Sequence, residues 1–194
     1  ENDALDLGTI FTDPGWLDEH VIQIDWGDGS TNTYTAVQEN IYPESTGGIG
    51  VTHLYGDNGE FAINIIVSDD EGASALLEIR VTVENMPPVL DTIADIEINE
   101  GESVHVLAHV TDPGSDDITI VYDWGYAGLP DTVKFYPSDA VNGLKDGPNS
   151  PAVDPRDIID SAAQIFGDNG VFEVTVTVLD DEGLSSVATF TVTV

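Results

Sequence analysis

The sequence contains one block of residues twice, and this repeat constrains the fold more than any other feature. Residues 53–83 and 164–194 align without a gap. Both run from an aromatic residue and Gly-Asp-Asn-Gly, through an alternating segment, to Asp-Asp-Glu-Gly and a second alternating segment. Two shorter matches precede the block in the same order: residues 11–15 with 110–114, and residues 25–27 with 123–125. Shared sections in the same order indicate two copies of one domain.

Apolar and polar residues alternate within each copy with the period of a β-strand. Phe172, Val174 and Val176 are separated by polar residues. In the first copy, Phe61, Ile63 and Ile65 alternate with Ala62, Asn64 and Ile66. Turn-forming residues separate these segments at the spacing of a β-sandwich, and no stretch has the periodicity of an amphipathic helix. The sequence therefore predicts an all-β chain with two tandem β-sandwich domains.

The domain boundaries follow from the alignment of the two copies. We expect a first domain over residues 1–84, with its first strand missing or truncated because Glu1 aligns with Glu100. We expect a second domain over residues 85–194, with a long inserted loop at about residues 125–163 that includes a short helical turn over residues 158–163. The abrupt start and stop suggest a fragment of a longer surface protein.

The charge of the chain narrows its partners. The 194 residues include 37 Asp and Glu but only 4 Lys and Arg, which gives a formal net charge of −33. Such a surface repels nucleic acid and anionic lipid, so we expect neither as a partner and no membrane insertion. High salt, as in a salt-loving host, or bound divalent cations would offset the repulsion. With no cysteine, disulfides and thiolate metal sites are excluded.

Several motifs resemble those of the polycystin-type (PKD) domain, an immunoglobulin-like sandwich. Residues 25–29 (Asp-Trp-Gly-Asp-Gly) are similar to that family's Trp-Asp-Phe-Gly-Asp-Gly signature, and residues 53–55, 59–61 and 68–72 resemble its later motifs. The second copy departs from the signature at residues 126–127 (Tyr-Ala). The resemblance implies two tandem immunoglobulin-like (PKD-type) domains. Family members serve as binding or spacer modules in microbial surface proteins, secreted hydrolases and adhesion molecules, and some bind calcium.

The topology of such a sandwich brings acidic loops from distant parts of the chain to one pole. In the second copy we expect the metal ligands to be Asn85, Asp112, Asp116, Asp117, Asp180 and Asp181. The matching cluster in the first copy contains Asp13 and Asp69, with Asp18 and Asp70 beside them. An all-oxygen ligand set of this kind is typical of calcium. The alternative is that these acids form solvated turns, as Asp before Pro-Gly often does.

Catalytic motifs are missing from the sequence, which predicts a protein that is not an enzyme. The four histidines form no His-Glu-x-x-His pattern, and there is neither a nucleophile elbow nor a phosphate-binding loop. We interpret the histidines as structural or solvent-facing, and Trp26 and Trp124 as core residues. Asp25 and Asp123 are expected to satisfy backbone donors.

Two functions remain open from the sequence. The first is a calcium-binding spacer or adhesion module of a large extracellular or cell-surface protein, with calcium making the domain junction rigid. The alternative is a carbohydrate- or protein-binding accessory module of a secreted hydrolase, with Trp16, Tyr126, Phe135 and Tyr136 as contact residues. The expected partners are other domains of the same protein and a surface polysaccharide or protein ligand.

Overall fold

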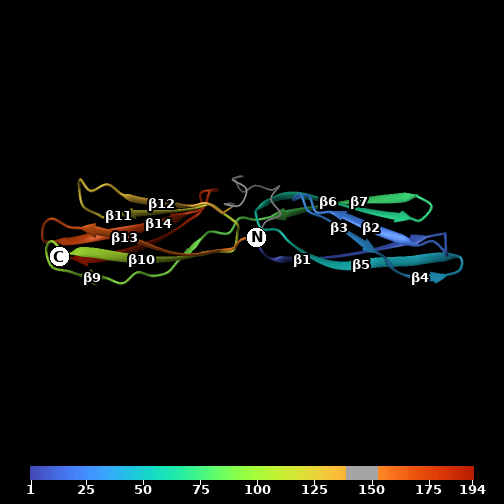
Figure 1. The fold of residues 1–194 in the computed structure, drawn as a ribbon, viewed down its shortest axis with the longest axis horizontal. Helices are drawn as coiled ribbons and strands as arrows, with labels where there is room; N and C mark the ends of the chain where they lie inside the picture. Colours follow the sequence, from blue (N-terminus) through green and yellow to red (C-terminus); the bar gives the residue numbers. More distant parts are fainter. Residues whose placement is uncertain (139–152) are drawn as a thin grey trace. The chain divides into compact units, whose positions relative to one another are not determined.

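The computed structural model describes residues 1–138 and 153–194, which form β-strands joined by turns and loops. These residues form two compact units that meet in sequence at Glu84 and Asn85, and each is described separately (Figure 1). Among the described residues there is no helix long and apolar enough to cross a membrane. The all-β class predicted from the alternation is therefore confirmed.

The first unit places seven strands in two sheets. One sheet has the order β1-β5-β4 and the other β3-β2-β6-β7, and all neighbouring strands are antiparallel. The strands are β1 (Ala4–Asp13), β2 (His20–Asp25), β3 (Thr31–Thr35), β4 (Val37–Ile41), β5 (Glu44–Leu54), β6 (Gly59–Asp69) and β7 (Ser74–Val83). The alternation predicted for β6 is present, because Phe61, Ile63 and Ile65 are buried in the core with Ile22, Ile24 and Trp26.

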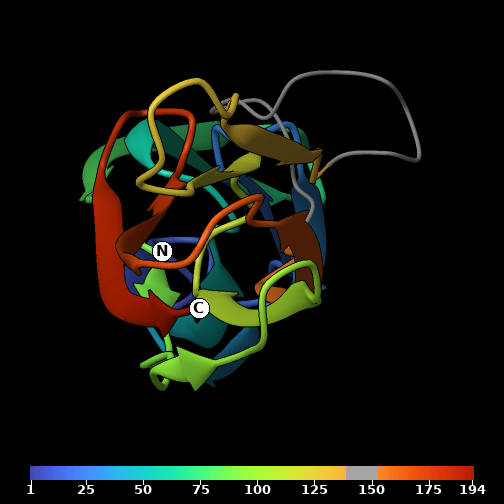
Figure 2. The same cartoon turned by 90° about the vertical axis from the view of Figure 1, so that its left-hand side faces the viewer.

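The second unit has sheets of order β13-β10-β8 and β12-β11-β14-β15-β9, whose strands surround a core (Figure 2). The pairing of β15 with β9 is parallel, and the other pairs are antiparallel. Its strands are β8 (Val89–Leu90), β9 (Ile96–Glu97), β10 (Ser103–Asp112), β11 (Ile118–Asp123), β12 (Thr132–Tyr136), β13 (Arg156–Ile165), β14 (Val171–Leu179) and β15 (Ser185–Thr193). Residues 1–84, all described, contain no counterpart of β8 and β9.

The helical turn expected over residues 158–163 is wrong, because this segment belongs to the ten-residue strand β13. Ile158, Asp160 and Ala162 point into the core, and β13 pairs with β10 along its whole length. The buried Asp160 is satisfied by the hydroxyls of Tyr122 and Tyr136, which donate to it at 2.8 and 2.6 Å. The expected loop over residues 125–163 is likewise interrupted by β12 and β13, and its residues 139–152 lie outside the described residues.

Candidate metal site

Antiparallel pairing brings two acidic segments together at one end of the second unit. Strand β10 ends at Asp112, and β14 ends at Leu179 beside Thr119, the second residue of β11. The loop over residues 113–117 and the turn over residues 180–184 therefore leave the sheets at the same end. Acidic residues far apart in sequence become neighbours there.

Asp180 organises the turn between β14 and β15. Its Oδ1 accepts a hydrogen bond from the Leu184 amide at 2.6 Å, and its backbone amide donates to the Leu184 carbonyl at 3.1 Å. Its Oδ2 accepts a hydrogen bond from Asn85 Nδ2 at 3.1 Å. Asn85 Oδ1 is buried and has no hydrogen-bond partner among the described residues. The first residue of the unit is thus held at its acidic end, as the sequence predicted, and it carries an unused carbonyl oxygen.

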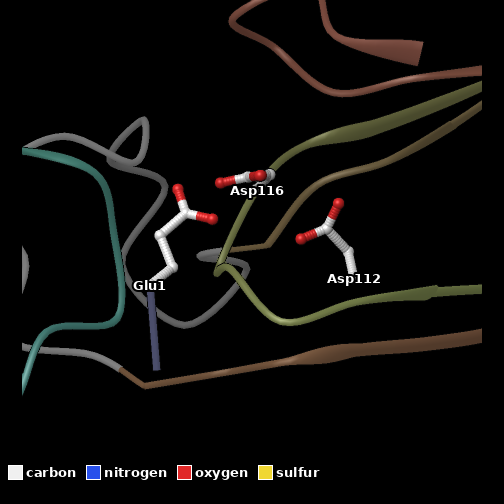
Figure 3. A group of neighbouring side chains, drawn as sticks. All are labelled: Glu1, Asp112 and Asp116. Atoms are coloured by element: carbon white, nitrogen blue, oxygen red, sulfur yellow. The ribbon is translucent and has the colours of Figure 1, made fainter. Parts of the chain in front are cut away.

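Asp112 and Asp116 lie side by side in the same region, with carboxylate oxygens within 4.8 Å of one another (Figure 3). Their exposed fractions are only 2% and 0%. Asp112 Oδ1 accepts a hydrogen bond from the Gly114 amide at 2.8 Å, whereas its Oδ2 is buried and makes no hydrogen bond within the described part of the chain. A buried carboxylate oxygen that lacks a donor is costly unless it is protonated or binds a cation.

The electrostatics of Asp112 show the same imbalance. Burial, and to a smaller degree the nearby carboxylates of Asp180 and Asp181, raise the pKa of this carboxyl, which ends at about 6. The Gly114 amide and the Arg156 guanidinium lower the pKa but do not compensate. In the metal-free protein the site therefore carries more negative charge at pH 7 than its surroundings can stabilise.

Three further acids complete this end of the unit. The carboxylates of Asp181 and Glu182, both exposed, have oxygens within 4.8 Å of each other and of Asp116. Glu182 was missed in the sequence, although it belongs to the repeated Asp-Asp-Glu-Gly. Asp117 differs, because its Oδ1 accepts a hydrogen bond from the Ser138 amide at 2.8 Å and so supports the loop. The predicted residues are close together, and their role as calcium ligands stays a prediction.

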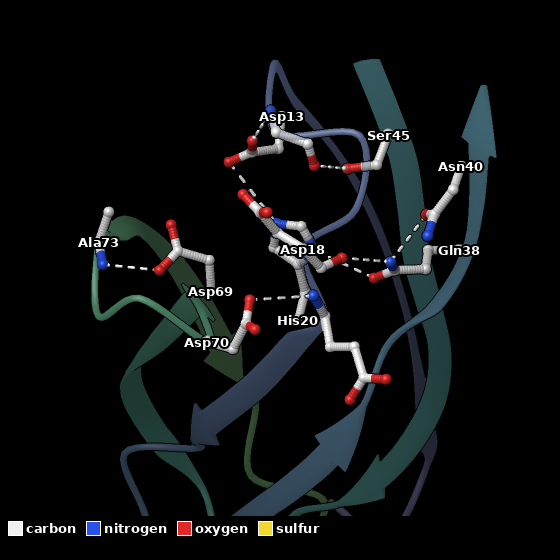
Figure 4. Close-up of polar contacts among 11 residues, drawn as sticks. Asp13, Asp18, His20, Gln38, Asn40, Ser45, Asp69, Asp70 and Ala73 are labelled. Atoms are coloured by element: carbon white, nitrogen blue, oxygen red, sulfur yellow. Dashed lines mark hydrogen bonds and ion pairs between the residues drawn. The ribbon is translucent and has the colours of Figure 1, made fainter. Parts of the chain in front are cut away.

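The first unit gathers a related cluster at its corresponding end (Figure 4). Oxygens of Asp13, Asp18 and Asp69 lie within 4.8 Å of one another, and Asp18 forms a second group with Asp70 and Glu71. Desolvation raises the pKa of the Asp18 carboxyl, with smaller contributions from Asp13 and Asp70. Asp69 repeats the turn geometry of Asp180, since its Oδ1 accepts a hydrogen bond from the Ala73 amide at 2.8 Å.

The residues interpreted as structural lie where the sequence placed them. Trp26 and Trp124 are buried in the two cores. The carboxylates of Asp25 and Asp123 accept hydrogen bonds from the amides of Gly27 and Gly125 at 3.0 and 2.9 Å. Both glycines have a positive φ, 84° and 64°, which a residue with a Cβ rarely adopts.

The imidazole of His53 is also structural. It stacks on Trp26 at 4.3 Å between ring centroids, and its Nε2 lies 2.7 Å from Oδ2 of the buried Asp28. Asp28 is the second residue after Trp26. The second copy has Tyr126 at the corresponding position, followed by Ala127, so it cannot form this contact.

Comparisons with known proteins add little to this geometry. No family model matches the chain. No curated protein matches it either. Among solved structures, red sea bream transglutaminase is similar over 99% of this chain and 29% of its own chain, with 12% sequence identity and a TM-score of 0.31. The chain thus spans less than a third of that protein, and similarity at this level supports no inference about activity.

Proposed function

We propose that the chain is a non-catalytic, calcium-binding spacer or adhesion module of a large extracellular or cell-surface protein. The observation that carries the proposal is the acidic end of the second unit, where Asp112 Oδ2 and Asn85 Oδ1 are buried without hydrogen bonds among the described residues. Calcium takes six to eight oxygen ligands at roughly 2.3–2.6 Å, often mixing carboxylate and amide oxygens. Asn85, Asp112, Asp116, Asp180 and Asp181 offer that chemistry.

The place of Asn85 in the chain supports the mechanical part of the proposal. It is the first residue of the second unit, and two prolines, Pro87 and Pro88, follow it closely. A calcium ion bound through Asn85 Oδ1 and Asp112 would fix the chain at the point where it enters the second unit. Stiffening a chain at a domain boundary is what a spacer requires. The motifs resemble the PKD type, whose members include spacer modules, and this support is an analogy to that family.

The test is a calorimetric calcium titration of chelator-treated protein. We expect Asp112→Asn and Asp180→Asn each to weaken calcium binding at least ~10-fold, because each removes a charge while keeping the shape of the side chain. Asp168→Asn is the matched control, since Asp168 precedes β14 and Asp180 follows it, at opposite ends of that strand. Small-angle scattering with and without chelator then tests stiffening. The proposal fails if the wild-type protein takes up no calcium.

A second measurement separates calcium from a general response to salt. Ligand binding to the folded state raises the unfolding free energy by about 2.7 kcal/mol at a concentration one hundred times Kd. We expect calcium to give such a rise when sodium chloride of the same ionic strength does not. Equal stabilisation by both salts would instead favour acidity as an adaptation to a high-salt habitat.

The runner-up function is a carbohydrate- or protein-binding accessory module of a secreted hydrolase. Two exposed aromatic rings favour it: Trp16 is 40% exposed and meets Tyr42 edge to face at 6.0 Å between centroids. Of the other aromatic candidates, Phe135 is largely exposed, and Tyr126 is as exposed as Trp16 although it packs on Phe172. Tyr136 donates its hydroxyl to Asp160. Binding to insoluble polysaccharides that is lost in Trp16→Ala, with calcium affinity unchanged, would replace the spacer by this function.

A further inference from the structure

The acidic end of the first unit contains a buried histidine that the second unit lacks. His20 opens β2 directly opposite Asp69 of β6, and its exposed fraction is 3%. The corresponding position of β11 is Ile118, with an exposed fraction of 0%. Because isoleucine fills this core position in the second unit, packing alone does not require a histidine here.

The imidazole of His20 presents an unprotonated nitrogen to the acids. Gln38 Nε2 donates hydrogen bonds to the Asp18 carbonyl at 2.6 Å and to Asn40 Oδ1 at 2.8 Å, so its Oε1 faces His20 Nδ1 at 3.0 Å (Figure 4). That oxygen only accepts, so the ring proton lies on Nδ1. In the neutral form of the imidazole, Nε2 then carries a lone pair. It is buried, has no hydrogen-bond partner among residues 1–138 and 153–194, and lies 3.6 Å from Asp13 Oδ2.

A lone pair that faces a carboxylate across this distance is stabilised by a cation between them. Two ligand atoms about 2.1 Å from a tetrahedral zinc ion are about 3.4 Å apart, close to the observed separation. Histidine ligands of zinc also donate their other ring N–H to a fixed acceptor, which is the arrangement that Gln38 provides. An imidazole ligand favours transition metals, whereas calcium takes oxygen ligands.

We propose that the first unit binds a divalent transition-metal ion, zinc by ligand chemistry, through His20 Nε2 and the carboxylates of Asp13 and Asp69. The three residues line one cavity of about 180 Å³. The Gly15 amide holds Oδ1 of Asp13 and the Ala73 amide holds Oδ1 of Asp69, which leaves the second oxygen of each for the metal. Asp18 lies within 4.8 Å of both acids and is the fourth candidate ligand.

Gly15 makes this arrangement possible. A Cβ at this position would lie 1.7 Å from Asp18 Oδ2 and 2.9 Å from Asp13 Oδ1. Only glycine therefore lets the two carboxylates approach each other around this turn. The site goes beyond the calcium function proposed for the second unit and does not depend on it.

The experiment is a zinc titration of the chelator-treated 194-residue chain in excess calcium, which competes with zinc for ligand sets made of oxygen alone. We expect His20→Ile, which copies the second unit, to lower zinc affinity at least ~10-fold, and Gln38→Leu to lower it about 10-fold through loss of the Nδ1 acceptor. The control is the double variant His105→Ala, His109→Ala, which removes the two strand histidines of β10 and should leave zinc affinity unchanged.

A readout on the unmutated protein avoids any folding defect. In ¹⁵N-edited NMR spectra, zinc should shift the His20 Nε2 resonance and leave Nδ1 protonated. Equal zinc affinity in wild type and His20→Ile would overturn the proposal, as would an unchanged Nε2 resonance. Calcium affinity that survives in His20→Ile while zinc affinity falls would show that the two sites act separately.

Discussion

The two units solve the same electrostatic problem at their acidic ends with different residues at one position. Where the first unit has His20 beside Asp13, the second has Ile118, next to Thr119, which pairs with Leu179 just before Asp180. The first end therefore combines nitrogen and oxygen donors, and the second has oxygen donors alone. For the metal sites proposed above, this difference at a single core-facing position would decide which class of cation each acidic turn holds.

Exchanging His20 and Ile118 tests whether this position distinguishes the two units. Ile118→His should lower the unfolding free energy of the second unit by about 3 kcal/mol, because it removes a buried apolar side chain and buries an imidazole without the acceptor that Gln38 provides. The reverse exchange, His20→Ile, should change the stability of the first unit by less than about 1 kcal/mol. Denaturant unfolding followed by hydrogen exchange in each unit measures both. Equal losses would contradict this expectation, because they would show that packing in the first unit requires the imidazole of His20.

The buried Asp28 is a second difference between the units, because the second copy has Tyr126 at the corresponding position. It accepts hydrogen bonds from the Ser30 amide and hydroxyl at 2.8 and 2.6 Å and contacts His53 Nε2 at 2.7 Å. Asp28→Ala should destabilise the first unit by about 2 kcal/mol, since it leaves these groups without a partner. The control is Asp25→Ala, which removes one exposed hydrogen bond and should cost less. A larger loss in the control would contradict the importance assigned to this contact.

The pH dependence that two buried aspartates, Asp28 and Asp112, contribute to their units should differ in sign. Burial raises the pKa of Asp28, whereas hydrogen bonds from Ser30 and His53 lower it, and the net pKa lies below the usual value. The stabilisation by Asp28 is therefore present above pH 3.8 and is lost on further acidification. The pKa of Asp112 is raised to about 6, so the metal-free second unit should gain about 1 kcal/mol, discounted for solvent screening, as the pH falls from 7 to 4. Asp112→Asn should abolish the gain, and calcium should reverse it. Hydrogen exchange at several pH values measures this, and parallel profiles would be the contrary result.

The smallest expected effect concerns His109, which lies outside both acidic ends. Hydrogen bonds to Asp91 at 2.8 Å and Asp157 at 2.9 Å raise the pKa of this histidine. The stabilisation is therefore full below pH 6.5 and is lost as the pH rises through the folded-state pKa. Asp157→Asn should move that pKa back toward 6.5 in an NMR titration. An unchanged pKa would show that Asp91 alone sustains the shift.

Local patterns predicted much of the fold. Alternation gave β6 and β14, and the repeated Asp-Asp-Glu-Gly gave the turns that place Asp69 and Asp180. The prediction of a loop and a helical turn is wrong for β13, because a core-facing Asp160 does not fit the pattern of a buried strand. The hydroxyls that satisfy Asp160 come from tyrosines of two other strands. That information is non-local and has no signature within the segment.

The candidate sites show the same division. The position of Asn85 beside Asp180 could be predicted, because topology alone brings the start of the unit to that turn. The environment of His20 could not, because it depends on the Gln38 amide of another strand. One signal was present nevertheless: aligning the start of β2 with the start of β11 sets His20 against Ile118.

The aspartates at the start of both hairpin turns have a consequence for how fast such sites can assemble. In each, one carboxylate oxygen is already engaged by an amide four residues ahead, at Ala73 or Leu184, so the other oxygen is aimed before distant segments arrive. Hairpins form in roughly 1–10 μs, far earlier than most long-range pairing. At the metal sites proposed above, a cation would meet a preoriented carboxylate on a newly formed hairpin. Its charge would then attract the remaining acidic loops, so the ion would take part in folding as well as in the folded structure.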